Sequence, residues 1–176
     1  MRLPLIHPTR LLRSLSLALA VLLPGVALAE PSMIYLVRHG EKAAVGNDPA
    51  LTPQGQLRAN NIAATLHRAG IGAIFSSATK RTLQTAQPLA TRLGLTVVQY
   101  DAATPQALVE KVKSLHGAVL VVGHSNTLPE LVRLFGGAPG EDIGDEEYDR
   151  LYQLINGKDG KVRTVLRTSL PVSPDP

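Results

Sequence analysis

Segments typical of β-strands and of α-helices alternate along most of the chain, and this alternation constrains the fold more than any other feature. Four short apolar runs predict strands, and a helical pattern follows each of them. The predicted strands cover residues 33–37, 73–76, 95–99 and 118–122. Such alternation is typical of a mostly parallel sheet with helices on both faces, so we expect a three-layer α/β/α sandwich.

Cap and stop residues mark the ends of the predicted helices. Thr52-Pro53 and Thr104-Pro105 each pair an N-cap residue with a proline that suits the first turn. Glycine closes three of the helices, because it adopts the left-handed conformation that ends a helix. The helices are expected from residue 53 to Gly70, from 79 to 93, from 105 to Gly117, and from 126 or 127 to 135. Pro88 is expected to bend or restart the second of them.

The end of the chain has a different pattern. Residues 136–149 are acidic and contain glycine and proline, which predicts a surface loop. Residues 150–155 and 162–168 alternate around a glycine-containing turn, which predicts a hairpin that adds an antiparallel edge to the sheet. We therefore expect one folded domain over residues 30–170 and a disordered tail over 171–176.

Residues 1–29 have the composition of a secretory signal peptide. Three arginines precede an apolar run over residues 15–26, and Ala27-Leu28-Ala29 forms an A-x-A cleavage site. Cleavage there predicts a periplasmic or secreted protein that begins at Glu30. The alternative is an uncleaved membrane anchor, but the apolar run is shorter than the ~20 residues that a span requires.

The charge of the chain depends on this leader. The leader holds three of the 18 basic residues and none of the 14 acidic ones, so the remaining 147 of the 176 residues carry a net charge of +1. That balance, together with few aromatic residues, argues against a nucleic-acid partner. After cleavage we expect no stable membrane association, and the oligomeric state stays open. The absence of cysteine excludes disulfides and thiolate metal sites.

Three polar clusters directly follow predicted strands. They are Arg38-His39-Gly40-Glu41, the segment from Ser76 to Thr82, and Gly123-His124-Ser125-Asn126-Thr127. Because the carboxyl ends of parallel strands meet at one edge of a sheet, we expect the clusters to converge there. Two histidines and two arginines at a helix N-terminus would form an anion site that contains a nucleophile. Ser76 and Asn126 are predicted to bind the substrate together with the two arginines.

This ordered set of motifs resembles the histidine phosphatase superfamily, also called the phosphoglycerate-mutase-like fold. The resemblance extends over Arg38-His39-Gly40-Glu41, Leu51-Thr52-Pro53-Gln54-Gly55, Ser76-Ser77 with Arg81-Thr82 and Thr85-Ala86, and Val122-Gly123-His124. It implies that His39 attacks phosphorus and becomes phosphohistidine. It also implies that Arg38 and Arg81 bind the phosphoryl oxygens and that His124 completes the pocket. Cations placed at these oxygens favour phosphoryl transfer.

The general acid is the point at which the chain departs from the family pattern. Phytase-like members have an aspartate directly after the second histidine, whereas Ser125 follows His124 here. Asp101, just past the third predicted strand, is one candidate, and Glu41, two residues from His39, is the other. A positioned acid contributes ~10²–10⁴-fold to a rate, so its absence would restrict the enzyme to good leaving groups.

The sequence predicts a metal-independent phosphatase that needs no cofactor, because no carboxylate spacing resembles a metal-binding motif. The substrate class is a phosphorylated small molecule or a phosphoprotein, including protein phosphohistidine as in the small members without the acid. Two alternatives remain: a phosphomutase, and a catalytically silent anion-binding domain. The helical positions of His67 and His116 favour ordinary structural roles for these residues.

Overall fold

The computed structural model of the protein describes residues 30–171 and 173. The predicted signal peptide lies outside the described residues, as do residues 172 and 174–176 of the predicted tail. Ser173 contacts the folded domain: its hydroxyl accepts a hydrogen bond from the Tyr148 backbone N–H at 2.9 Å, and its own N–H donates to Asp149 Oδ2 at 3.0 Å. No helix within the described residues has the length and apolar character that a membrane span requires.

One six-stranded sheet forms the centre of the fold, with the strand order β3-β2-β4-β1-β5-β6. Strands β1 to β4 are mutually parallel, whereas β5 pairs antiparallel with β1, and β6 pairs antiparallel with β5. The strands are β1 (Met33–Arg38), β2 (Ile71–Ser77), β3 (Val97–Tyr100), β4 (Ala118–Gly123), β5 (Arg150–Asn156) and β6 (Val162–Thr168). The predicted mostly parallel sheet with an antiparallel edge hairpin is confirmed.

Four helices begin near the predicted caps. They are α1 (Pro53–Leu66), α2 (Lys80–Leu93), α3 (Pro105–Lys113) and α4 (Leu128–Leu134). Helices α1 to α3 connect the parallel strands, and α4 lies between β4 and β5. The Thr52 hydroxyl accepts a hydrogen bond from the Gly55 N–H at 3.1 Å, which caps α1 as expected. Helix α2 is one continuous element that includes Pro88, so this proline does not restart it. Gly94 ends α2 in the left-handed conformation with φ 66°.

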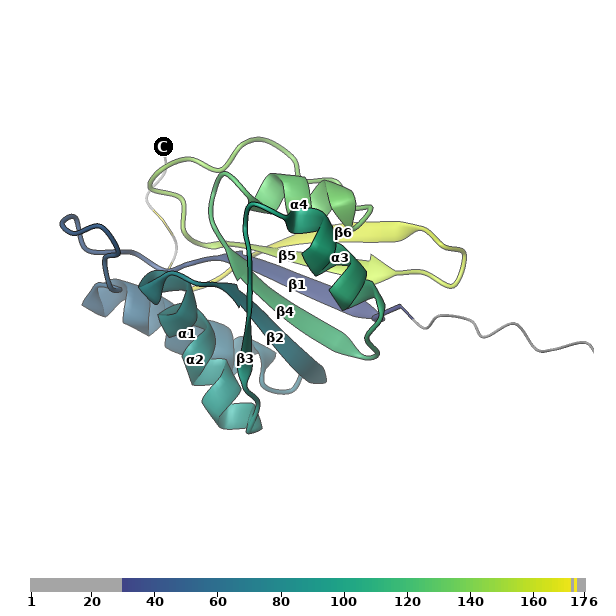
Figure 1. The fold of residues 1–176 in the computed structure, drawn as a ribbon, viewed down its shortest axis with the longest axis horizontal. Helices are drawn as coiled ribbons and strands as arrows, with labels where there is room; N and C mark the ends of the chain where they lie inside the picture. The colour runs from purple at the N-terminus through teal and green to yellow at the C-terminus, as the bar shows by residue number, and fades with distance from the viewer. Residues whose placement is uncertain (1–29, 172, 174–176) are drawn as a thin grey trace, which may run out of the picture.

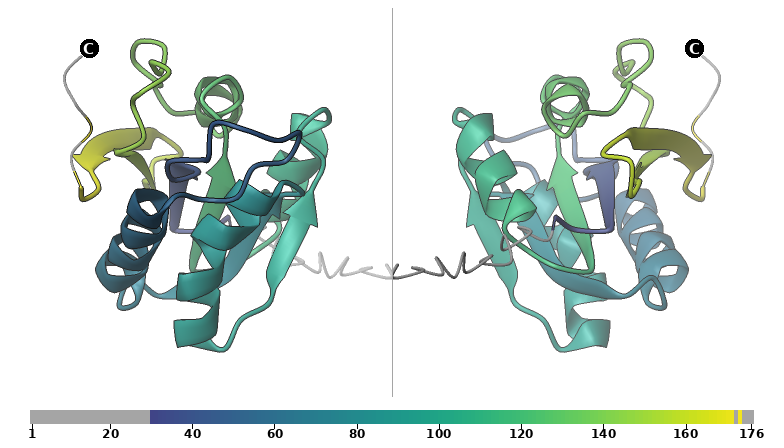
Figure 2. Two further views of the ribbon diagram at one scale, coloured as in Figure 1. Left: turned by 90° about the vertical axis from the view of Figure 1, so that its left-hand side faces the viewer. Right: turned by 90° about the vertical axis from the view of Figure 1, so that its right-hand side faces the viewer.

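The helices cover the two faces of the sheet, as Figures 1 and 2 show: α1 and α2 lie on one side, and α3 and α4 lie on the other. Side chains of β1 alternate between the two resulting cores. Ile34 and Leu36 pack in the core beneath α3 and α4, whereas Tyr35 and Val37 pack in the core beneath α1 and α2. The predicted three-layer α/β/α sandwich is therefore confirmed.

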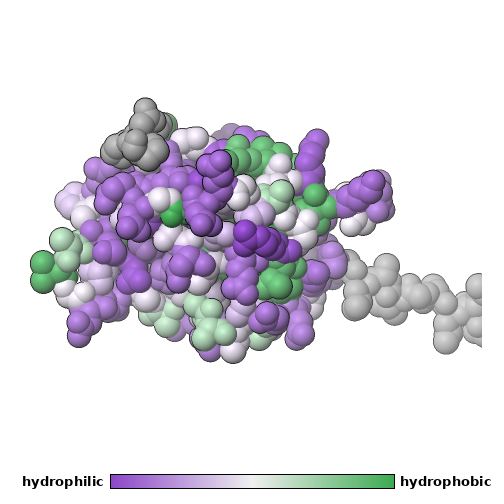
Figure 3. Space-filling model, turned by 90° about the horizontal axis from the view of Figure 1, so that it is seen from above, coloured by the Kyte–Doolittle hydropathy of each residue, from purple (hydrophilic) through white to green (hydrophobic). Residues whose placement is uncertain are grey.

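Strand β4 is buried along its whole length, which explains its uninterrupted apolar sequence. It lies between β1 and β2, the two strands that lead to the other polar clusters. The face of the molecule in Figure 3 is mostly hydrophilic, with hydrophobic residues in small separate areas. The buried apolar residues form two cores, one on each face of the sheet, and these cores hold the central strands in place.

A close contact between two backbone segments fixes the loop that follows β1. The first turn of α1 packs against this loop so closely that a Cβ atom on Gly55 would collide with the Glu41 carbonyl oxygen and lie 2.8 Å from the Glu41 nitrogen. A Cβ atom on Gly40 would lie 2.7 Å from the Gly55 carbonyl oxygen. Both positions require glycine because backbone atoms, rather than flexible side chains, occupy the space.

We predict that Gly55→Ala lowers the free energy of unfolding by about 1–3 kcal/mol, because the backbone must shift to accept the methyl group. Urea denaturation measures the change. Gly72→Ala is the matched control, since no atom lies within 4 Å of a Cβ atom built there. Equal stability of the two variants would contradict the tight contact between α1 and the loop.

Candidate active site

The ends of three adjacent strands bring the polar clusters together. Strand β4 lies between β1 and β2, with Arg38 in register with Gly123 and Ser76 in register with Val122. The His39 N–H continues the ladder past β1 by donating to the Gly123 carbonyl at 3.0 Å. The histidine after β1 and the histidine after β4 are thereby held side by side, with ring centroids 5.4 Å apart and an edge-to-face angle of 67°.

The ring of His39 is buried and has a defined tautomer. Its Nδ1 lies 2.8 Å from the Gly40 carbonyl oxygen, which can only accept a hydrogen bond. Nδ1 therefore carries the proton, and Nε2 presents its lone pair. A neutral imidazole with a free Nε2 is the form in which histidine acts as a nucleophile.

The loop of His39 is also tied to helix α2. The Gly40 N–H donates to Thr85 Oγ1 at 3.0 Å, and the Thr85 hydroxyl donates to the Arg81 carbonyl at 2.7 Å. Thr85 is buried on the inner side of α2, in the helix whose first turn carries Arg81. The nucleophile candidate and the second arginine are thus positioned by one continuous set of hydrogen bonds.

The ring of His124 has the opposite tautomer. Its Nδ1 faces Arg81 Nη2 at 3.4 Å, and because guanidinium groups only donate, this nitrogen is an acceptor. Its Nε2 lies 2.8 Å from Ser77 Oγ and therefore donates a hydrogen bond to that hydroxyl. Ser77 and Arg81 thus hold the ring of His124 at its two nitrogens, Ser77 at Nε2 and Arg81 at Nδ1.

Burial keeps both rings neutral. Loss of hydration lowers the pKa of His39 to about 3, and the positive charge that His124, Arg38 and Arg81 can carry adds to this effect. Burial also lowers the pKa of His124 to about 4, with further contributions from the two arginines. The site therefore concentrates fixed positive charge on the guanidinium groups and leaves the imidazoles uncharged.

Arg38 is almost completely buried, with 5% of its surface exposed. Its Nη1 donates to the carbonyl oxygens of Gly144 and Glu147, both at 2.8 Å, and its guanidinium carbon lies 4.1 Å from the ring centroid of Tyr148. The loop before β5 thus holds this cation by two hydrogen bonds and a cation–π contact. The same tyrosine ring lies 5.9 Å from that of His39.

Arg81 is held less tightly than Arg38. Besides contacting His124, Arg81 forms a long ion pair with Asp48, in which Nη1 lies 3.8 Å from Oδ1. The Asp48 side chain is 42% exposed, so this pair holds the guanidinium group only weakly. Within the described residues, the Nε atoms of both arginines are buried without a hydrogen-bond acceptor. Buried N–H donors are costly unless they are paired, so an oxyanion is the kind of ligand that these groups favour.

The two general-acid candidates occupy different positions. The Glu41 carboxylate faces helix α1, where it pairs with Arg58 Nη2 at 2.7 Å and Arg58 Nε at 3.1 Å. Burial alone would raise the pKa of Glu41, but the hydrogen bonds and charge of Arg58 outweigh this and lower it. A carboxylate held ionised in an ion pair cannot supply a proton. Asp101 lines a cavity of about 500 Å³ together with His124 and Ser77, and its Oδ1 accepts a hydrogen bond from the Ala103 N–H at 2.9 Å.

Ser76 and Asn126, the other two predicted substrate-binding residues, form no hydrogen bond with His39 or His124 within the described residues. Ser76 is fully buried in β2, and its hydroxyl donates to the Ser77 carbonyl at 2.9 Å, so it cannot reach a ligand. The next residue, Ser77, contacts His124 instead. Asn126 is exposed and lines a separate cavity of about 430 Å³ with residues of α4 and of the acidic loop.

Three residues of the site had no role predicted from the sequence. Ser77 and Thr85 lie in motifs that carry the family resemblance, so those motifs could have indicated a role for them. Tyr148 lies more than 100 positions from Arg38, inside a segment whose sequence predicts only a loop. Among the described residues, no group of three or more histidine, aspartate or glutamate side chains is arranged to hold a metal ion.

The fold and this pair of histidines flanked by arginines define an α/β protein with an anion site at the sheet edge. The family model of the histidine phosphatase superfamily (branch 1) matches residues 34–104 of the chain. This match confirms the resemblance to the histidine phosphatase superfamily that the motifs indicate. No curated protein sequence matches the chain.

Solved structures of similar fold cover most of the chain. A mycobacterial glucosyl-3-phosphoglycerate phosphatase, in complex with inorganic phosphate, is 17% identical and aligns with a TM-score of 0.60 over 78% of this chain and 96% of its own. A phosphoserine phosphatase from Entamoeba histolytica is 19% identical, with a TM-score of 0.57 over 78% and 95%. A candidate phosphohistidine phosphatase, SixA, from Agrobacterium tumefaciens is 23% identical, with a TM-score of 0.57 over 81% and 99%. These likenesses show the fold.

The lowered pKa values of His39 and His124 predict a pH dependence of stability. Each ring is neutral in the folded protein down to a pKa of about 3 or about 4, whereas the unfolded chain binds these protons near the ordinary value of 6.5. The two rings therefore do not reduce the free energy of unfolding above about pH 6.5. As the pH falls from there toward the pKa values of the folded state, the free energy of unfolding decreases. We expect a loss of roughly 1–2 kcal/mol per ring between pH 7 and pH 5.

Urea denaturation at several pH values between 5 and 7.5 tests this expectation. The double variant His39→Asn, His124→Asn lacks both rings, so its stability should depend less steeply on pH over the same range. An identical slope in the variant and the wild type would contradict the assignment of neutral, buried histidines.

Proposed function

We propose that this protein is a phosphatase that hydrolyses phosphomonoesters, or protein phosphohistidine, through a phosphohistidine intermediate on His39. The observation that carries the proposal is the tautomer of this ring, because the hydrogen bond from Nδ1 to the Gly40 carbonyl leaves Nε2 free. Two guanidinium groups with unpaired buried N–H donors flank the ring. The match to the superfamily model over residues 34–104 and the similarity to phosphatases of known structure support the same class of reaction.

In the first step, the Nε2 lone pair of His39 attacks phosphorus, and the bond from phosphorus to the leaving atom breaks, which is an oxygen in a phosphomonoester and a nitrogen in phosphohistidine. Arg38 and Arg81 stabilise the negative charge on the equatorial oxygens during this transfer. A neutral nucleophile suits an anionic substrate, since it brings no additional negative charge to the transition state. The leaving oxygen of a phosphomonoester takes up a proton and departs as an alcohol. With protein phosphohistidine, the bond that breaks is the one between phosphorus and an imidazole nitrogen, and the substrate leaves as a neutral histidine.

In the second step, a water molecule attacks phosphorus and the bond from phosphorus to Nε2 breaks. The water proton leaves to a base, phosphate is released, and His39 returns to its neutral form. Asp101 is the proposed acid for the first step and base for the second, because it lines the same cavity as His124 and takes part in no ion pair within the described residues. The reaction requires no metal ion, since the two arginines supply the positive charge.

We predict that His39→Ala abolishes turnover of a phosphomonoester panel while the folded state is retained. Wild-type protein quenched during turnover should carry one acid-labile, base-stable phosphate on His39, detected by mass spectrometry. Activity should persist when a chelator is added. His67→Ala is the matched control, because this histidine lies exposed at the end of α1. Near-wild-type activity of the His39 variant would remove the proposed mechanism.

We predict that Asp101→Asn selectively slows hydrolysis of substrates with poor leaving groups. An alkyl phosphate needs protonation of the departing oxygen, whereas an aryl phosphate with an acidic phenol does not. The expected loss is ~10²-fold or more for alkyl phosphates and less than about 3-fold for such aryl phosphates. The measurement is kcat for both substrates. Equal losses on the two would show that Asp101 does not act as the acid.

A further inference from the structure

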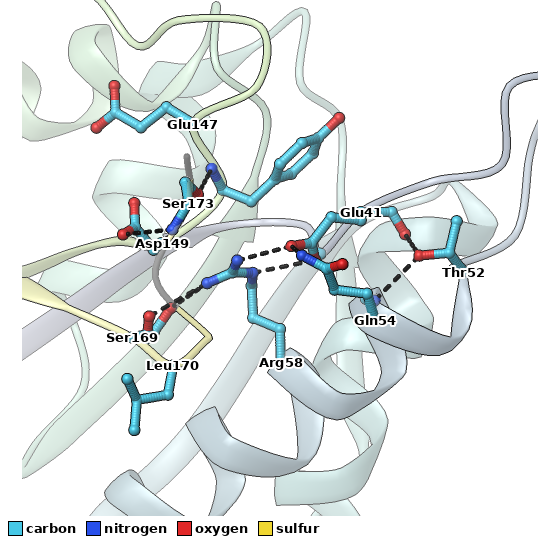
Figure 4. A network of polar contacts seen from close by, with 12 residues as sticks. Glu41, Thr52, Gln54, Arg58, Glu147, Asp149, Ser169, Leu170 and Ser173 are labelled. Atoms are coloured by element: carbon cyan, nitrogen blue, oxygen red, sulfur yellow. Dashed lines mark hydrogen bonds and ion pairs between the residues drawn. The ribbon is translucent and has the colours of Figure 1, made fainter. Parts of the chain in front are cut away.

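Arg58 is the most deeply buried charged residue of the described chain, with 0% of its surface exposed, and none of its hydrogen bonds goes to His39, His124, Arg38 or Arg81. Figure 4 shows its guanidinium group at the centre of a polar network. Two of its nitrogens form the paired contact with the Glu41 carboxylate, and its Nη1 donates to the carbonyl and the hydroxyl of Ser169 at 3.2 Å and 3.1 Å. One side chain of α1 thus joins the loop after β1 to the segment after β6.

This network fixes Glu41 at both its side chain and its backbone. The Gln54 side chain donates to Glu41 Oε1 at 3.0 Å, which supplements the two bonds from Arg58. The Glu41 carbonyl accepts hydrogen bonds from the Thr52 N–H at 2.8 Å and from the Thr52 hydroxyl at 3.3 Å. Residue 41 is therefore held against the first turn of α1 from two directions.

Because Glu41 is held in place, the direction of the Gly40 carbonyl group is also fixed. The Gly40 carbonyl belongs to the peptide unit whose nitrogen is that of Glu41, and peptide units are planar. The same carbonyl is the acceptor for His39 Nδ1 at 2.8 Å. The other side of Gly40 is held by Thr85. Rotation of the peptide unit between residues 40 and 41 would turn this acceptor away from the ring.

We propose that Arg58 is a positioning residue that sets the tautomer of His39 through Glu41 and the Gly40 carbonyl. The proposal rests on the proposed function for its catalytic consequence. A buried ion pair contributes little net stability compared with apolar side chains of similar volume, so stability alone is a weak reason for a charged pair here. The two parallel hydrogen bonds of an arginine fork give directional control that a single ammonium group does not.

Two measurements test the role of Arg58. Long-range ¹H–¹⁵N correlation spectra of histidine-labelled protein without substrate distinguish a protonated ring nitrogen from an unprotonated one. We expect His39 to be protonated at Nδ1 alone in the wild type and at either nitrogen in Arg58→Gln and Arg58→Lys. The expected kinetic effect is a loss of about 10- to 100-fold in kcat with KM changed by less than about twofold, because the nucleophile is misplaced while the arginines still bind phosphate.

Leu154→Ala is the control for lost stability, because this core residue of β5 is fully buried near the opposite end of β1. We expect it to lower the melting temperature without changing the His39 tautomer. If Arg58→Gln does not fold, Glu41→Gln replaces it, since Glu41 is partly exposed and the amide keeps one hydrogen-bond acceptor. This variant should give the same mixed tautomer and a smaller loss of kcat.

An unchanged Nδ1-protonated ring in the folded variants would overturn the proposal, as would a loss of kcat no larger than that of Leu154→Ala. A wild-type protein that hydrolyses no phosphoester, but whose His39 tautomer changes in Arg58→Gln, would overturn the proposed function and support the positioning role. The two proposals therefore fail separately.

Discussion

The hydrogen bond between His39 Nδ1 and the Gly40 carbonyl is the interaction on which the site depends. It assigns the ring proton to one nitrogen and leaves the other available, and burial then keeps the ring from taking up a second proton. Two further hydrogen bonds hold this contact in place. The His39 N–H bonds to the Gly123 carbonyl, and the Gly40 N–H bonds to Thr85 of helix α2. The proposed nucleophile, with one defined tautomer, can then lie beside two permanently charged arginines and stay neutral.

The architecture could be predicted because each strand and helix has a strong local signal. The uninterrupted apolar sequence of β4 reflects burial on both faces, and threonine–proline pairs mark the starts of α1 and α3. The ends of strands and helices differ from the prediction where tertiary contacts outweigh local preference. Strand β3 begins at Val97 instead of residue 95 because pairing with Ile74 of β2, not local apolarity, determines its start.

Site residues could be predicted where they directly follow a strand. They could not be predicted where their role depends on a contact with a residue distant in the sequence. His39, Arg38, Arg81 and His124 lie at strand ends or in the first turn of a helix, and the topology brings them together. The role of Glu41 depends on Arg58, which is 17 positions away and has no sequence pattern that indicates a buried cation. The choice between Ser76 and Ser77 depends on which hydroxyl faces His124, and adjacent serines in a fully buried strand end give no such information. Tyr148 could not be found because a loop sequence does not specify its contacts.

The position of β1 in the sheet has a consequence for how the protein folds. This strand begins at residue 33, yet its two neighbours are β4, which begins at residue 118, and β5, which ends at residue 156. Pairings of such large sequence separation form late, because the intervening chain must be closed into a loop first. Helices α1 and α2 can form and pack while β1 still lacks both ladders. The loop that carries His39 therefore follows a strand whose two ladders form only when residues 118–156 are present in the chain.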